Sequence, residues 1–168
     1  MKPKLNLGCA DDIREDCHNV DHWNACTSKD PRIHNYLTCK IDQHVNLDSP
    51  WWPWPDNQFE KIIAHDIIEH LPNKIQTMNE CYRVLTPKGI LEIIVPTTNG
   101  ASAFQDPTHV SYWNRNSFWY YEEGSPYRER FALSYGIIAK FKVLGVDVFT
   151  SPVKEEGEKL AILLEAVK

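Results

Sequence analysis

Two histidines and an aspartate, carried by two short segments, could act on the proton of a bound substrate. His109 lies in QDPTHVSYW, three residues after Asp106, and His70 lies in IIEHLP. Histidine is the commonest proton acceptor near neutral pH, so His109 is the first candidate for a base and His70 the second, with Asp106 placed to orient an imidazole. In the competing structural interpretation, His109 caps a turn or faces solvent, and Glu69 and His70 orient a loop.

A short acidic segment near the N-terminus has the position of a nucleotide-binding loop. KLNLGCADDIREDCHNVD places one glycine, Gly8, after a predicted strand, where dinucleotide sites usually have three. The acids of this segment are Asp11, Asp12, Glu15 and Asp16. They would repel a pyrophosphate, but they are compatible with S-adenosylmethionine, which has no phosphate and carries a sulfonium and an ammonium. Asp21, at the end of the next strand, could accept hydrogen bonds from the ribose; the alternative is a solvated acidic turn.

Composition limits the classes of protein to consider. With 168 residues, 42% of them apolar, the chain can form one domain with a substantial core. A net charge of −5 without a long Lys/Arg run makes a nucleic-acid partner unlikely. No apolar run reaches the roughly 18 residues of a membrane span, and no signal peptide precedes the first strand, so we expect a cytoplasmic protein. The five cysteines form no CxxC pair and are expected to be reduced.

Strands and helices alternate along the chain. The strands are expected over residues 5–9, 18–21, 39–47, 59–64 and 89–96, with little or no helix between the first two. A helix capped by Asn73 should run to about Val84 and end at TPKG, and GILEIIVP has the continuous apolar run of a central parallel strand. Residues 97–130 are expected to be an aromatic-rich loop with one helical turn at 117–122. Residues 139–150 and 159–168 should form an antiparallel hairpin, which completes a doubly wound α/β domain over 1–168.

Four segments together resemble a known family. LNLGC…NVD, PWPDNQFEKIIAHDIIEHL, ECYRVLTPKGILEIIVP and AFQDPTHVSYWNRNSF, in this order and spacing, resemble the class I S-adenosylmethionine-dependent methyltransferases of the small type 11 branch, over about residues 4–118. The resemblance implies a mostly parallel, seven-stranded Rossmann-like sheet. It also implies a set of cofactor-binding residues: Leu7, Gly8 and Cys9 under the methionine moiety, Asp21 at the ribose, Asn46 and Leu47 at the adenine, and His65 and Asp66 beside the sulfonium. The chain departs from the family at Ala10, where a second glycine is usual.

The same segments contain side chains that could bind a metal. Asp106 and His109 could supply two ligands, but the sequence identifies no third one. Asp66, Glu69 and His70 could also form a cluster, although their place in the methyltransferase pattern already accounts for them. The sequence therefore predicts no metal site.

Two aromatic segments allow both packing and binding roles. WWPWP, at residues 51–55, could stack on a flat ligand, but by resemblance it is better explained as a proline-braced loop that packs over the adenine side. The later aromatic cluster is too interrupted by polar residues for one buried strand, so part of it is expected to line the acceptor pocket. It consists of Phe104, Tyr112, Trp113, Phe118, Trp119, Tyr120 and Tyr121. Either this loop covers the acceptor, or a second subunit of a homodimer does.

Two motifs that the sequence lacks argue against nucleic-acid bases as the methyl acceptor. The D/N-P-P-aromatic stretch of enzymes that methylate base amines is absent after the fourth strand, and so is a nucleophilic cysteine for pyrimidine methylation. A small molecule, a sugar or a protein side chain remains as the acceptor, and a small molecule or a sugar, methylated on oxygen or nitrogen, is the leading expectation. Two alternatives stay open: a methyltransferase-like binding or regulatory protein with little turnover, and a nicotinamide-dependent oxidoreductase on a similar sheet.

Overall fold

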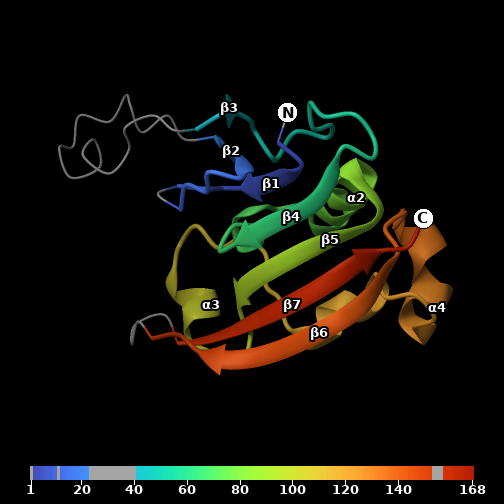
Figure 1. Ribbon diagram of the computed structural model, residues 1–168. Coiled ribbons are helices and arrows are strands. Elements are labelled where there is room, and N and C mark those ends of the chain that lie inside the picture. The colour runs from blue at the N-terminus through green and yellow to red at the C-terminus, as the bar shows by residue number, and fades with distance from the viewer. Residues whose placement is uncertain (1, 11, 23–40, 153–156) are drawn as a thin grey trace.

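A seven-stranded mixed sheet forms the centre of the molecule. The computed structural model describes residues 2–10, 12–22, 41–152 and 157–168 (Figure 1). In spatial order the strands are β3 (Gln43–His44), β2 (Cys17–Asp21), β1 (Lys4–Leu7), β4 (Phe59–His65), β5 (Leu85–Pro96), β7 (Glu158–Ala166) and β6 (Phe141–Thr150). The first five strands are parallel, whereas β7 pairs antiparallel with both β5 and β6. The predicted α/β fold with an antiparallel C-terminal hairpin is confirmed.

The register of the parallel strands brings their carboxyl ends to one edge of the sheet. Leu7 at the end of β1 pairs with Val20 of β2 and with Ala64 of β4, and His65 pairs with Ile94 of β5. The segments that follow these strands therefore emerge side by side, which is where open α/β sheets bind ligands.

The two faces of the sheet are covered unequally, which corrects the expectation for β5. Leu91, Ile93 and Val95 are buried in the core, but Glu92 and Ile94, on the other face, are only partly buried. Glu92 forms ion pairs there with Lys61 at 2.6 Å and with His65 at 2.8 Å. β5 thus alternates like a strand with one solvated face, although its sequence is typical of a strand buried on both.

The helix α2 (Lys74–Val84) matches its prediction at both ends. The Asn73 side chain accepts a hydrogen bond from the backbone N–H of Gln76 at 3.0 Å, as an N-cap residue does. Leu85 then has extended backbone angles, and β5 begins directly at this residue. The strand is therefore four residues longer than predicted, because TPKG forms its first part and includes Lys88 with a φ of 64°.

The connections at the N-terminal end are short. No helix occurs within residues 12–16, between β1 and β2, as the spacing predicted. β3 contains only Gln43 and His44, so the third strand is much shorter than the predicted 39–47, whose first two residues lie outside the described part of the chain.

The predicted loop at 97–130 contains more helix than expected. It holds α3 (Ser102–Gln105) and η3 (Arg115–Tyr120), and α4 (Pro126–Tyr135) begins within it. The sequence prediction missed α4 altogether. Its boundary signals are present, Ser125 before a proline at the start and Gly136 with a φ of 72° at the end, but only Ala132 within it is buried, so no apolar period marks it.

Three of the five tryptophans in the described part of the chain, Trp52, Trp54 and Trp113, pack in the core. Trp52 and Trp54 are buried, which supports the packing interpretation of WWPWP, and Trp51 is exposed. Trp113 and Phe118 are also buried and stack with centroids 5.3 Å apart, so the expectation that the later aromatic cluster is not core was wrong for these two and for Tyr121.

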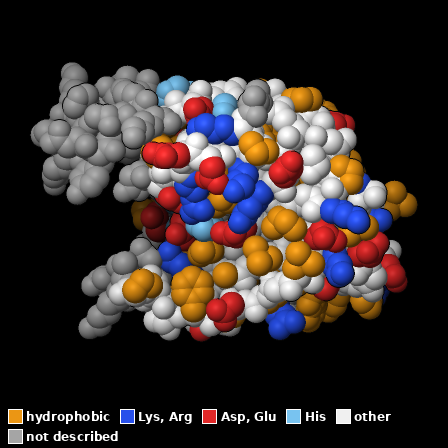
Figure 2. Space-filling view, viewed as in Figure 1, with side chains coloured by type: hydrophobic (Ala, Val, Ile, Leu, Met, Phe, Trp, Pro, Cys, Tyr) orange, Lys and Arg blue, Asp and Glu red, His pale blue; other side chains and the backbone are white. Residues whose placement is uncertain are grey.

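The surface seen in Figure 2 has no continuous basic area. Lys and Arg side chains are interspersed with Asp and Glu on this face. None of the helices among the described residues has the length and apolar character that a membrane span requires.

A buried carboxylate anchors the WWPWP loop to α2. Glu80 is 3% exposed; its Oε2 accepts hydrogen bonds from the Trp52 backbone N–H and from Arg83, both at 2.7 Å. Arg83 also donates to the backbone carbonyl of Trp54 at 2.8 Å.

We expect Glu80→Ala to lower the free energy of unfolding by about 1 to 3 kcal/mol, because it leaves the buried Trp52 N–H without its acceptor and removes one of the two carboxylates paired with Arg83. Urea denaturation measures the change. Glu129→Ala, at an exposed position of α4, is the control and should change stability by less than about 0.5 kcal/mol. Equal stabilities of the two variants would contradict the anchoring role.

Candidate active site

The loop after β1 has the backbone form of a tight ligand-binding turn. Gly8 has a φ of 58°, and a Cβ atom there would lie 2.5 Å from the Ile67 side chain, so only glycine fits. Ala10, with a φ of 39°, also lies in the left-handed region, which costs an alanine about 1 to 2 kcal/mol. Its N–H donates to Asp21 Oδ2 at 2.9 Å. Asp21 thus holds the loop in place from the end of β2.

The charge of this loop is less negative than the sequence suggested. Asp12 pairs with Arg14 at 2.6 Å, and Asp16 pairs with Lys4 at 2.6 Å. Arg14 also lies 3.2 Å from His65 Nδ1, at the end of β4. Sequence reasoning counted the acids and overlooked Arg14, so the repulsion of a pyrophosphate is weaker than expected. Asp11 lies outside the described residues.

The other residues expected at the cofactor differ in exposure. Leu7 and Cys9 are buried, so only their backbone can face a ligand, and burial raises the pKa of the Cys9 thiol to about 12. Leu47 is buried and its carbonyl accepts the Trp52 indole N–H at 3.1 Å, whereas Asn46 is exposed.

The end of β4 also carries charged groups. His65 Nε2 lies 2.8 Å from Glu92, and Asp66, with a φ of 50°, forms an ion pair with Lys159 at 2.8 Å. Asp66 is thus placed at the end of β4, as expected, but it already has a cationic partner from β7.

A cavity of about 500 Å³ opens beside this ion pair. Its walls come from the ends of β4 and β5, the start of β7 and the segment around α3. The lining residues are Asp66, Glu69, His70, Pro96, Ser102, Gln105, Asp106, Pro107, His109 and Lys159. The three candidates for proton transfer, His109, His70 and Asp106, therefore lie in one cavity.

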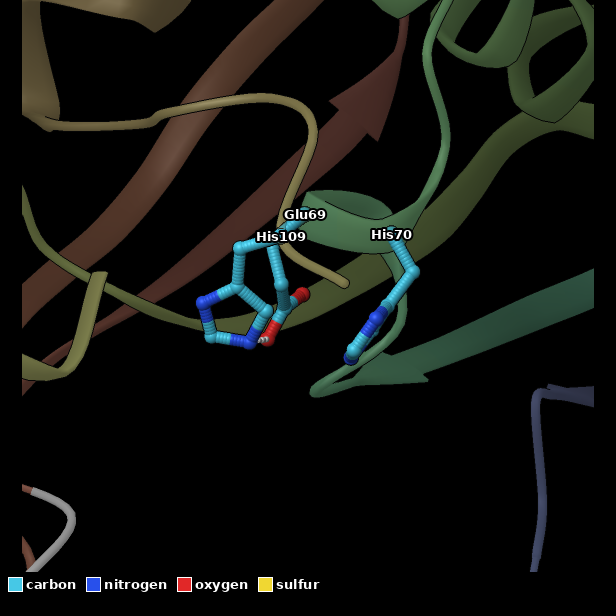
Figure 3. Close-up of side chains that lie close together, drawn as sticks. All are labelled: Glu69, His70 and His109. Carbon is cyan, nitrogen blue, oxygen red and sulfur yellow. Dashed lines mark ion pairs between the residues drawn. The ribbon is translucent and has the colours of Figure 1, made fainter. Parts of the chain in front are cut away.

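Glu69, His70 and His109 form its chemical centre. Figure 3 shows Glu69 and His70 projecting from η2 (Ile68–His70) and His109 from the loop after α3, with the three side chains close together. The two imidazole centroids are 4.8 Å apart, and His109 Nε2 lies 3.9 Å from Glu69 Oε1. That last separation is too long for a hydrogen bond.

Glu69 is a buried carboxyl group whose two oxygens have no hydrogen-bond partner among the described residues. The residue is 2% exposed, and burial raises the pKa of its carboxyl to about 8. Its backbone is well bonded, since its carbonyl accepts the N–H groups of Val110 and Ser111, both at 2.9 Å. From its sequence position, Glu69 was expected only to orient the loop after β4.

Both imidazoles are held through their Nδ1 atoms. His109 Nδ1 lies 3.1 Å from the carbonyl oxygen of Ala103, which can only accept, so Nδ1 carries the proton and Nε2 a lone pair. His70 Nδ1 lies 3.0 Å from Thr108 Oγ1, which donates its own proton to Asp106 at 2.6 Å. His70 therefore donates from Nδ1 as well, and burial lowers its pKa. Asp106 orients His70 through Thr108, whereas the sequence suggested His109 as a partner.

Sequence reasoning missed Lys159, which lines the cavity, and Thr108, which supports His70 and Asp106. Thr108 lies inside the quoted segment QDPTHVSYW, and its hydroxyl next to two polar candidates was an available signal. Lys159 comes from β7, near the C-terminus, and no local pattern links it to Asp66.

Comparison with known proteins shows which family this part of the chain is similar to. Residues 20–93, from β2 into β5, match the type 11 model described as a methyltransferase domain. The matched segment is thus similar to a methyltransferase domain, a class whose cofactor is S-adenosylmethionine. The loop fits this cofactor, because it combines a close-approach glycine with a carboxylate at the end of β2, the arrangement that would hold a ribose.

Solved structures share the fold of this chain. A chain of the complex between the Haloferax volcanii Trm112 methyltransferase activator and a methyltransferase is 12% identical with a TM-score of 0.64, covering 98% of this chain and 82% of that one. An S-adenosylmethionine-dependent methyltransferase of Methanosarcina mazei is 14% identical, with a TM-score of 0.61 and coverages of 98% and 92%. The [4+2]-cyclase SpnF is 14% identical, with a TM-score of 0.60 and coverages of 98% and 74%. No curated protein matched the sequence.

We expect Glu69→Gln in metal-free buffer to be at least as stable as the wild type, with a gain of up to about 1 to 3 kcal/mol, because a neutral amide is cheaper to bury than an unpaired carboxyl group. Thermal or urea unfolding with a chelator present measures this. A clear loss of stability would show that the carboxylate has a stabilising partner in the folded protein.

Proposed function

We propose that this methyltransferase domain transfers a methyl group to an oxygen or nitrogen of a small-molecule or sugar acceptor bound in the 500 Å³ cavity. The observation that carries the proposal is the meeting of His70 and His109, each with a free Nε2 lone pair, in a cavity beside the end of β4. A cofactor on the loop after β1 and an acceptor in this cavity would then share the carboxyl edge of the sheet.

For the cofactor, we propose the binding residues that the resemblance to class I methyltransferases implies. Asp21 holds the ribose, Asn46 and Leu47 contact the adenine, and the backbone of residues 7–9 lies under the methionine moiety. His65 and Asp66 border the sulfonium, where Asp66 and the partly exposed Asp21 supply negative charge. Arg14, on the same loop, provides a positive group suited to the carboxylate of the methionine.

The acceptor side must position a nucleophile and manage its proton. When bound, S-adenosylmethionine supplies a methyl group activated by the sulfonium, so that the electron pair of the broken carbon–sulfur bond stays on sulfur. His109 Nε2 takes the proton of the acceptor hydroxyl or ammonium. Thr108 and Asp106 fix the ring of His70 beside it.

The size and charge of the cavity favour a small neutral or cationic acceptor. A volume of about 500 Å³ lies within the range of small-molecule sites. The carboxylates of Asp66 and Asp106 face it against the single ammonium of Lys159 among the described lining residues, so a phosphorylated acceptor or a nucleic-acid backbone would be repelled. Sugar hydroxyls and amines fit both properties.

A second candidate is a methyltransferase-like binding protein without turnover. Two features of the loop after β1 favour this second candidate. Ala10 adopts a left-handed conformation, and Asp21 already accepts the Ala10 N–H, so less space and fewer hydrogen-bond acceptors remain for a cofactor. Leu133 and Ile138, which are 97% and 70% exposed, could pack against a second copy or another protein in such a role.

We expect Asp21→Ala to weaken S-adenosylmethionine binding by about 1.5 to 3 kcal/mol, or about 10- to 150-fold, because the ribose loses a charged hydrogen-bond partner. Equilibrium dialysis with labelled cofactor measures it. Asp21→Asn keeps an acceptor for the Ala10 N–H and separates loop support from ribose binding. Asp147→Asn, on the exposed strand β6, is the control. Unchanged affinity in Asp21→Ala would remove Asp21 from the site.

We expect His109→Ala to slow methyl transfer by about 100- to 10,000-fold while cofactor affinity stays within about twofold, as loss of proton transfer would do. The assay follows labelled methyl from S-adenosylmethionine into a panel of sugars and amines. An equal rate for the variant would exclude His109 from the mechanism. Cofactor binding with no transfer to any acceptor would favour the binding-protein candidate.

A further inference from the structure

We infer that Glu69, His70 and His109 form a binding site for one divalent transition-metal ion. One ligand atom from each residue lies within 4.8 Å of the other two. Ligand atoms around such an ion stand about 3 to 4 Å apart when each bond is about 2.1 Å long, so small side-chain rotations would close the site. The structure supplies the third ligand, Glu69, that the sequence did not identify beside Asp106 and His109, and it replaces Asp106 by His70.

The unpartnered carboxyl group of Glu69 is the strongest sign of a missing cation. It is 2% exposed, both of its oxygens lack a hydrogen bond among the described residues, and it faces His109. A buried polar group in a native protein normally has a partner, since leaving it without one costs about 1 to 3 kcal/mol. A cation between Glu69 and the two imidazoles would provide that partner.

The surroundings of the two histidines are those of metal ligands. A metal-binding imidazole usually donates its other N–H to a carbonyl or a carboxylate, which fixes the ring and its tautomer. His109 donates to the Ala103 carbonyl, and His70 donates to Thr108, which is bonded to Asp106. The free Nε2 atoms are thereby available as ligands.

The charge of the cavity favours a cation over an anion. Two carboxylates, Asp66 and Asp106, face it with one ammonium, Lys159, which is itself paired with Asp66. Glu69 becomes a third carboxylate when an ion displaces its proton. Two neutral imidazoles and one carboxylate suit Zn²⁺, Co²⁺ or Fe²⁺ better than Mg²⁺ or Ca²⁺, which prefer oxygen ligands. Three protein ligands also leave a position open for an acceptor oxygen.

The chemical role of the ion rests on the proposed methyl transfer, whereas the binding of the ion to Glu69, His70 and His109 does not depend on it. An acceptor hydroxyl coordinated to the metal would have a lower pKa and would release its proton to solvent before its oxygen takes the methyl group. His109 would then be a ligand and not the base. The mechanism would need no further proton acceptor at this position.

In the first test, protein that has been treated with a chelator is titrated with Co²⁺ alone. Visible absorption and calorimetry follow the binding. Zn²⁺ is then added as a competitor, and Mg²⁺ serves as the comparison ion. We expect one ion per chain, displaced by Zn²⁺ and not by Mg²⁺. Glu69→Gln and His70→Ala should weaken binding by at least about 100-fold, since even changes outside the ligand set cost about 10- to 100-fold. His44→Ala, at an exposed histidine of β3, should bind normally.

The second test asks whether the histidine is oriented as the structure shows. Thr108→Val keeps the size of the side chain but removes the acceptor for His70 Nδ1, and it should weaken Co²⁺ binding by about 10- to 100-fold. Unfolding of Glu69→Gln in metal-free buffer is the control for this variant. If the variant is as stable as the wild type, its weaker Co²⁺ binding is not caused by loss of folding.

Two results would overturn the inference: no stoichiometric Co²⁺ binding to the wild type, or binding with a sulfur charge-transfer band that survives Glu69→Gln, which would place the ion on cysteine. Cofactor binding measured in the presence of the chelator keeps the two proposals separate. A protein that binds S-adenosylmethionine but no Co²⁺ refutes only the metal site. A protein that binds Co²⁺ but no S-adenosylmethionine refutes only the proposed function.

Discussion

The carbonyl oxygen of Glu69 accepts the N–H groups of Val110 and Ser111, and these two bonds hold the segment after β4 against the segment after β5. His70 lies next to Glu69 in the first segment, and His109 lies next to Val110 in the second. Two residues that are 39 positions apart in sequence are thereby brought to 4.8 Å between ring centroids. The cavity and any chemistry within it depend on this junction, which the parallel register of β4 and β5 makes possible.

The same junction buries the Glu69 carboxyl group, and this burial lowers the free energy of unfolding. A carboxyl group without a partner opposes folding, and burial raises its pKa to about 8. Glu80 provides the contrast, because its buried carboxylate is bonded to Arg83 and to the Trp52 backbone. Glu80 therefore has the contacts of a structural group, whereas Glu69 lacks such contacts, which is why we propose it as a metal ligand.

Sequence reasoning succeeded where local signals were complete and failed where partners were distant. Asn73 and the helical spacing after it predicted α2, and Gly8 marked the tight turn, because caps and positive φ angles leave clear residue preferences. α4 was missed because its exposed surface has no apolar period, and Trp113 and Phe118 were misjudged because tertiary contacts bury them. The three candidates His70, His109 and Asp106 line one cavity, and their catalytic roles stay predictions. The ion pairs of Asp12 with Arg14 and of Asp66 with Lys159 depend on the folded chain and have no local sequence signal.

We propose that the loop after β1 binds a sulfonium cofactor, although Ala10 replaces a glycine and Arg14 reduces the negative charge of the loop. The most direct test is calorimetric titration of the purified protein with S-adenosylmethionine, S-adenosylhomocysteine and NAD in parallel. We expect saturable binding of the first two with one site per chain and none of NAD. Binding of NAD alone, or of none of the three, would contradict it.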